Sequence, residues 1–192
     1  MKAPNLMPSI LIRRFVDEKR EWIMKMMEKY HKADKSGKRQ YKEGEEFMYM
    51  GNKYKLHIGD FNKIAVSDTF NFPHFLLFRI EQEIHEWYIR EARRFITMRV
   101  NHHADIMKAT YKDIYFSDTI SKWGSCSHDN SLQFNWRLVM APILVIDYVI
   151  VHELVHTREK NHKDGFWRKV RLYKPAYKQY KKWLNENSRL LF

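Results

Sequence analysis

The sequence has little of what marks a secreted or membrane-spanning protein. A single cysteine, Cys126, excludes an internal disulfide framework. No apolar run reaches the length of about 18 residues that a membrane-spanning helix needs. Residues 1–15 contain no uninterrupted apolar stretch of the length found in signal peptides. We therefore expect a cytoplasmic protein that has no membrane partner.

The composition is that of a globular protein with a strong excess of positive charge. Hydrophobic residues make up 44% of 192 residues, enough for a packed core, and the formal net charge is +12. Residues 158–192 contain eleven Lys and Arg but only three acids. A basic surface favours anionic partners, so nucleic acid is a candidate partner for the C-terminal part. The alternative is that these charges belong to ordinary solvated helix faces.

The N-terminal quarter is predicted to contain a helix, a linker and a hairpin. Apolar residues at helical spacing predict an amphipathic helix over residues 9–31, followed by a polar linker within 33–46. Strands at 47–50 and 53–58 are expected to pair. They flank Gly51-Asn52, and a glycine that comes first in a two-residue loop favours a type II′ turn.

The remaining chain is predicted to mix short strands with helices, which is typical of an α+β domain. Period-two alternation and apolar runs predict strands at 61–67, 111–116 and 131–138. Helical spacing predicts helices at 73–109, 143–157, 164–173 and 176–187. We expect a helix and linker over residues 1–46 and one domain over 47–192, or else a single domain over 1–192.

The segment from His152 to His162 has the spacing of a metal site. His152 and His156 are four residues apart, so a helix projects both imidazoles from one face. If the helix ends near Thr157, the chain can turn back and offer His162 as a third ligand. Three imidazoles with a fourth position open to water are typical of catalytic zinc.

Glu153 follows the first of these histidines, so it flanks the metal position rather than binding there. A general base for a metal-activated water belongs at this place. We therefore expect a zinc-dependent hydrolase, with a peptidase as the first choice. A substrate strand is expected to pair along an exposed edge at 131–138.

Several segments around the histidines, taken in order, resemble those of the YgjP-like metallopeptidase family, which is related to the SprT-like and WLM zinc peptidases. These segments are Ser121–Ser127, Phe134–Leu138, Ala141-Pro142, Val145–Val149, His152–His156, Asn161-His162 and Phe166-Trp167. The strongest resemblance covers residues 111–187. The histidine spacing equals that of the metzincins, but Glu159 replaces their turn glycine and no methionine follows Met140. A true metzincin is therefore excluded.

The resemblance implies a zincin-like α+β fold, in which an N-terminal helix and a β-hairpin or small sheet pack on a C-terminal helical part that carries the HExxH helix. It implies that His152, His156 and His162 are the metal ligands and that Glu153 is the catalytic acid/base. It also places the loop around Ser125 beside the active site.

Three further residues are candidates for binding substrate. Asn135 and Arg137 alternate onto one face of the strand predicted at 131–138, and either can donate hydrogen bonds to a substrate carbonyl or phosphate. Ser125 is the third candidate, because the resemblance places its loop beside the active site.

Three alternatives to a simple peptidase stay open. Some members of the family carry a nucleotide (UTP) pyrophosphatase label, and such an enzyme would use the same metal with basic C-terminal residues holding the phosphates. The chain has no Gly-rich phosphate loop, which weakens this reading. The second alternative is a nucleic-acid-associated SprT-like protease, and the third is a metal-binding module without activity.

Overall fold

The computed structural model describes residues 9–21, 24, 39–119 and 121–191. Its packing divides the chain into two compact units, Met1–Gln40 and Tyr41–Phe192. In the first unit, the helix predicted over residues 9–31 is confirmed as α1 (Ser9–Glu18). Residues 22–23 and 25–31 of that prediction, and residues 33–38 of the predicted linker, lie outside the described residues.

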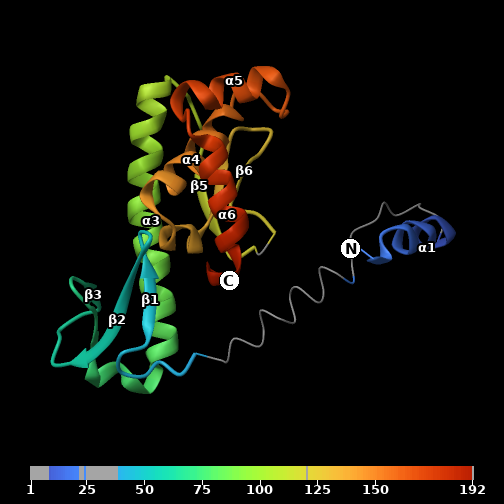
Figure 1. Ribbon diagram of the computed structural model, residues 1–192. Helices are drawn as coiled ribbons and strands as arrows, with labels where there is room; N and C mark the ends of the chain where they lie inside the picture. The colour runs from blue at the N-terminus through green and yellow to red at the C-terminus, as the bar shows by residue number, and fades with distance from the viewer. Residues whose placement is uncertain (1–8, 22–23, 25–38, 120, 192) are drawn as a thin grey trace. The chain divides into compact units, whose positions relative to one another are not determined.

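In the second unit, a long helix separates two small sheets (Figure 1). Its first turns are a 3-10 helix, η1 (His74–Arg79), which continues as α3 (Ile80–Met107). The predicted helix at 73–109 is therefore confirmed, with a tighter first segment. It ends at Lys108, whose left-handed φ of 50° turns the chain out of the helix.

The first sheet packs on the N-terminal half of α3. Its strands are β1 (Glu46–Tyr49), β2 (Asn52–Gly59), β3 (Ala65–Val66) and β4 (Phe70–Pro73), in the order β1-β2-β4-β3. β2 and β4 are parallel, and the other two pairs are antiparallel. The fully buried Phe70 packs against Trp87 of α3 with ring centroids 4.7 Å apart. Of the strand predicted at 61–67, only Ala65 and Val66 form a strand.

The hairpin between β1 and β2 is confirmed, but its predicted type II′ turn is wrong. Tyr49 pairs with Asn52, so the loop residues are Met50 and Gly51. Their φ angles of 50° and 85° are both positive, which is the pattern of a type I′ turn. A Cβ on Gly51 would lie 2.8 Å from the backbone of Pro142, so only glycine fits this contact.

The second sheet has the order β5-β7-β6, and comprises β5 (Ile114–Ser117), β6 (Gly124–Cys126) and β7 (Leu132–Asn135). β5 and β7 are parallel, whereas β6 and β7 are antiparallel. The strand predicted at 131–138 is wrong beyond Asn135, because the amide of Asn135 accepts a hydrogen bond from the backbone N–H of Arg137 and starts the 3-10 helix η2 (Trp136–Met140). The expected exposed edge there is also wrong, since β7 is the central strand.

Three further helices complete the unit: α4 (Ile143–Val155), α5 (Asp164–Tyr173) and α6 (Tyr177–Leu191). They confirm the helices predicted at 143–157, 164–173 and 176–187. α4 is apolar almost all round and packs against α3, α5, α6 and β6, so it is the central helix of the unit. The expected α+β class is therefore confirmed. Among the described helices, none combines the length and apolar character that crossing a bilayer requires.

Candidate metal centre

The C-terminal end of α4 brings two imidazoles together. His152 and His156 lie one turn apart with ring centroids 4.9 Å apart. The helix ends at Val155, and the chain then turns back as the sequence predicts. His162 returns to the pair, with its Nε2 3.1 Å from the Nε2 of His152 and 3.0 Å from the Nε2 of His156.

The three Nε2 atoms fit a single cation. Two nitrogens that bind tetrahedral zinc at about 2.0–2.1 Å lie roughly 3.3–3.4 Å apart, close to the distances found here. The Nδ1 of His156 lies 2.8 Å from the carbonyl oxygen of Glu159. A carbonyl only accepts, so Nδ1 is the protonated atom and Nε2 keeps its lone pair for a ligand.

The surroundings favour the neutral imidazoles that metals bind. Burial lowers the pKa of His152 to about 3, and the charges of His156, His162 and Lys181 act in the same direction. Burial also lowers the pKa of His156, although the hydrogen bond to Glu159 opposes this effect. Both rings are therefore uncharged at neutral pH.

Aromatic side chains of α5 form a platform beneath the histidines. The fully buried Phe166 packs against His152, His156 and His162 with centroid distances of 4.8, 4.4 and 4.7 Å. Trp167 stacks on His162 at 5.7 Å and an interplanar angle of 27°. Sequence reasoning used these two aromatics only as part of a family resemblance, because nothing in their spacing shows that they lie under the histidines.

Glu153 follows His152 on α4, and its side chain packs against Gly124 of β6. It is only 5% exposed, and burial raises the pKa of its carboxyl group to about 8, with the charge of Lys122 opposing. A Cβ on Gly124 would lie 2.8 Å from both the Cγ and the Oε1 of Glu153. Glycine at this position therefore leaves room for the carboxylate.

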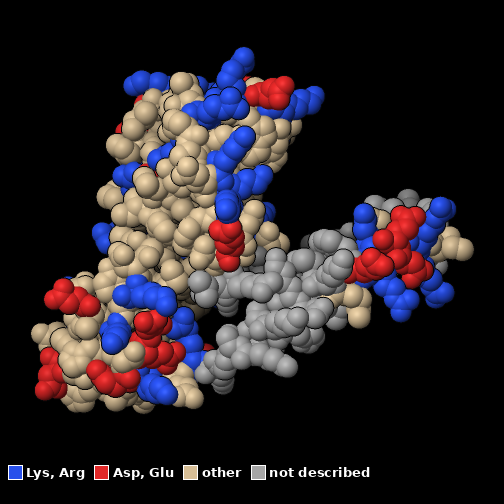
Figure 2. All heavy atoms as spheres, viewed as in Figure 1, with Lys and Arg blue, Asp and Glu red and all other residues tan. Residues whose placement is uncertain are grey.

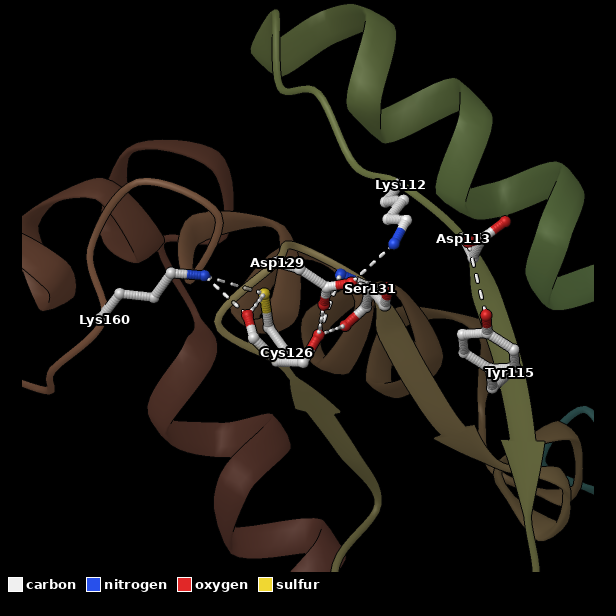
Figure 3. Close-up of polar contacts among 8 residues, drawn as sticks. Lys112, Asp113, Tyr115, Cys126, Asp129, Ser131 and Lys160 are labelled. Carbon is white, nitrogen blue, oxygen red and sulfur yellow. Dashed lines mark hydrogen bonds and ion pairs between the residues drawn. The ribbon is translucent and has the colours of Figure 1, made fainter.

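Lys160 joins the loop that carries His162 to the end of β6 (Figure 3). Its Nζ donates to the carbonyl oxygen of Ser127 at 2.8 Å and to the Oδ1 of Asn130 at 2.6 Å, and lies 3.6 Å from the Sγ of Cys126. Burial raises the pKa of the Cys126 thiol, although the charge of Lys160 opposes this effect. Cys126 is therefore a neutral thiol. The contacts of Lys160 with Ser127 and Asn130 link two segments that are distant in sequence, and we call them the Lys160 clamp.

Of the three substrate-binding candidates, two hold the chain that leads into β6. Asn135 is 1% exposed and its amide donates to the carbonyl of Thr119 at 2.8 Å. Arg137 forms an ion pair with Asp118, and its guanidinium lies over the ring of Trp136 at 4.2 Å.

The third candidate, Ser125, lies on β6 itself. Its Oγ accepts a hydrogen bond of 3.0 Å from the Nζ of Lys122. The role of Asn135, Arg137 and Ser125 in binding substrate stays a prediction.

Comparisons with known proteins address the family of the chain. No curated protein matches it. Two solved metallopeptidase zymogens are similar: jannalysin of Methanocaldococcus jannaschii (23% identity, TM-score 0.43, 47% of this chain and 94% of that one) and abylysin of Pyrococcus abyssi (16% identity, TM-score 0.43, 47% and 93%). The sequence model of a family described as "YgjP-like, metallopeptidase domain" matches residues 1–187. The chain therefore belongs to the YgjP-like family and contains its metallopeptidase domain.

Proposed function

We propose that this metallopeptidase-family protein is a zinc-dependent peptidase, with His152, His156 and His162 as ligands and Glu153 as general base. The observation that carries the proposal is the convergence of three imidazole nitrogens, with the buried Glu153 following His152 on α4. Three nitrogen ligands suit zinc better than magnesium or calcium, which prefer oxygen.

Glu153 would move the protons of the reaction. A bound zinc ion supplies a Lewis acid that polarises a peptide carbonyl and acidifies water. A cation held by the three histidines would oppose the effect of burial on Glu153 and favour its carboxylate. In the proposed reaction, this carboxylate would accept a proton from the attacking water and pass it to the leaving amine. Phe166 and Trp167 pack against the histidines and would keep these metal ligands oriented during the reaction.

The edge of β6 offers a place for an extended peptide. Backbone hydrogen bonds across β6 and β7 join Trp123 to Asn135 and Ser127 to Ser131. Pairs in an antiparallel ladder alternate between bonded and non-bonded. The N–H and C=O of Gly124 and Cys126 therefore point away from β7. No described strand pairs with that side of β6, so a substrate strand can add there, next to Glu153.

A peptide fits the site better than a nucleotide. Among the described residues, the only cluster with metal-ligand geometry consists of His152, His156 and His162, and no cluster of carboxylates is present to hold magnesium phosphates. Peptide hydrolysis is therefore the proposed reaction, with UTP hydrolysis as the comparison assay.

The test is the variant Glu153→Gln. We expect it to keep one equivalent of zinc while peptide hydrolysis falls by roughly 100- to 10,000-fold, because the ligands remain and the base is lost. Glu159→Gln is the matched control. Its carboxylate contacts Lys169 at 2.7 Å, whereas its backbone carbonyl, which the variant retains, contacts His156. Undiminished hydrolysis in Glu153→Gln would remove Glu153 from the mechanism, and a wild-type protein that binds no zinc would refute the site.

A further inference from the structure

Lysines approach the metal centre from three different elements. Lys122 precedes β6, and its Nζ is held 3.0 Å from the Oγ of Ser125. Its positive charge acts on Glu153. Lys160 follows α4, and its Nζ is fixed at the far end of β6 by the contacts with Ser127 and Asn130. A peptide paired with β6 would therefore run between two cations.

The third lysine reaches the histidines from α6. The Nζ of Lys181 lies 5.3 Å from the ring centroid of Trp167, in a cation–π contact. Trp167 in turn lies 5.8 Å from His152 and 5.7 Å from His162. Lys181 is exposed, and its charge contributes to the lowered pKa of His152. A substrate at the metal is therefore within reach of this charge as well.

Two of the acids near these lysines, Asp129 and Glu159, form ion pairs with other lysines. Asp129 contacts the Nζ of Lys112 at 3.0 Å, and Glu159 contacts the Nζ of Lys169 at 2.7 Å. Asp164 begins α5 directly after the exposed Lys163. Figure 2 shows lysines and arginines gathered over α5 and α6. Asp129 and Glu159 are therefore already paired with other lysines, and do not form ion pairs with Lys122, Lys160 or Lys181.

We propose that Lys122, Lys160 and Lys181 make this metal centre selective for peptides with acidic side chains near the cleaved bond. The inference rests on the proposed peptidase function and names its substrate class. Lys122 and Lys181 are exposed and can contact substrate carboxylates, whereas Lys160 is held by the protein and adds a fixed charge. Opposite charges across a binding site attract the correct partner and repel a basic one.

The test profiles cleavage of a peptide library by the zinc-loaded protein. Both ends of every peptide are blocked, so that only side chains carry charge, and cleaved bonds are identified by mass spectrometry. We expect Asp and Glu to be enriched near the cleaved bond about tenfold over Lys and Arg at low salt, and less at high salt. In Lys122→Glu with Lys181→Glu, the preference should invert. Lys55→Glu, an exposed lysine of β2 in the other sheet, should leave it unchanged.

Three other results would overturn the proposed selectivity for acidic peptides. Cleavage without a charge preference, or a preference that the double variant keeps, overturns the inference and leaves the peptidase proposal intact. Cleavage that occurs in a matched library with free C-termini, but not in the blocked library, would assign the lysines to the terminal carboxylate, and so overturns side-chain selectivity. Failure to cleave any peptide by a zinc-loaded protein overturns both the inference and the proposed function.

Discussion

Asp147 and Glu153 are two buried acids on α4 whose pKa values shift in opposite directions. Burial by itself would raise the pKa of Asp147, but hydrogen bonds from His103, Arg99 and Lys174 outweigh it and hold that pKa well below its usual range. The carboxylate lies 2.6 Å from Arg99 and 3.0 Å from Lys174. Burial dominates at Glu153 and raises its pKa to about 8. The neighbours therefore keep Asp147 ionised in ion pairs, whereas Glu153 lacks such partners among the described residues and is the proposed general base.

Replacing Asp147 with Asn should destabilise the fold. Arg99 and Lys174 would remain without their anion at a site that is 2% exposed, and breaking such a buried pair costs about 3–5 kcal/mol. Urea unfolding at pH 7 measures the difference from wild type. The folded pKa of Asp147 lies below the unfolded value of about 3.9, so the difference is present above about pH 4 and shrinks as pH falls. A difference that stays constant to pH 2 would contradict this account.

Gly124→Ala should lower hydrolysis without removing the metal. The added methyl group would lie 2.8 Å from two atoms of Glu153, so either the carboxylate or β6 must move. A displacement near 1 Å at a reacting group costs about 100-fold in rate. Zinc content and kcat measured on the same preparation check this prediction. Gly44→Ala is the control: its φ of 80° strains an alanine and so affects stability, but nothing lies near the missing Cβ and Glu153 is not touched. Equal kcat in Gly124→Ala and wild type would disprove the steric argument.

Between elements, the Lys160 clamp holds the loop between α4 and α5 against the turn after β6. His162 lies in this loop, so its position depends on the clamp. We expect Lys160→Met to weaken zinc binding by about 10- to 100-fold, the range found when groups that orient metal ligands are removed. Competition with a chelator measures the affinity, and the spectrum of the cobalt-substituted protein reports the ligand geometry. Lys163→Met in the same loop should change neither, and an unaltered cobalt spectrum in Lys160→Met would exclude the positioning role.

Among the elements, the sequence predicted helices better than strand ends. α4 is a long apolar run that begins after Pro142, and α5 has apolar residues at helical spacing, so both could be recognised as helices. β7 ends early because the Asn135 side-chain oxygen accepts a hydrogen bond from the Arg137 backbone N–H and so competes with the extended backbone. Alternation in the sequence does not reveal this contact. β6 has three residues and no alternation, so only its pairing with β7 identifies it.

For the whole second unit, zinc should contribute to stability because it binds the folded arrangement of three histidines. Free zinc at 100 times its dissociation constant would add about 2.7 kcal/mol, or roughly 5–10 °C in Tm for a chain of this size. Calorimetry with and without a chelator measures the change. His162→Ala should abolish most of the zinc-dependent increase, and a Tm that chelation does not alter would argue against a bound ion.

The functional site was only partly predictable because it combines local and distant contributions. Histidine spacing on one helix is local, so His152, His156 and the adjacent Glu153 could be recognised from sequence. Phe166, Gly124 and Lys160 reach the site through packing between elements. Gly124 and Phe166 stand out only as parts of segments that resemble the family, and Lys160 does not stand out at all, because periodicity and spacing do not show that these residues contact the site.

Two of the three imidazoles stand on a buried helix, whereas the third comes from an exposed loop. An incoming ion would meet a fixed pair of nitrogens first, and the loop would then close behind it. The rate at which the ion exchanges with solvent would therefore depend on how often the loop opens, while α4 stays folded. Protein from which the metal ion has been removed should consequently bind the ion again quickly, without unfolding.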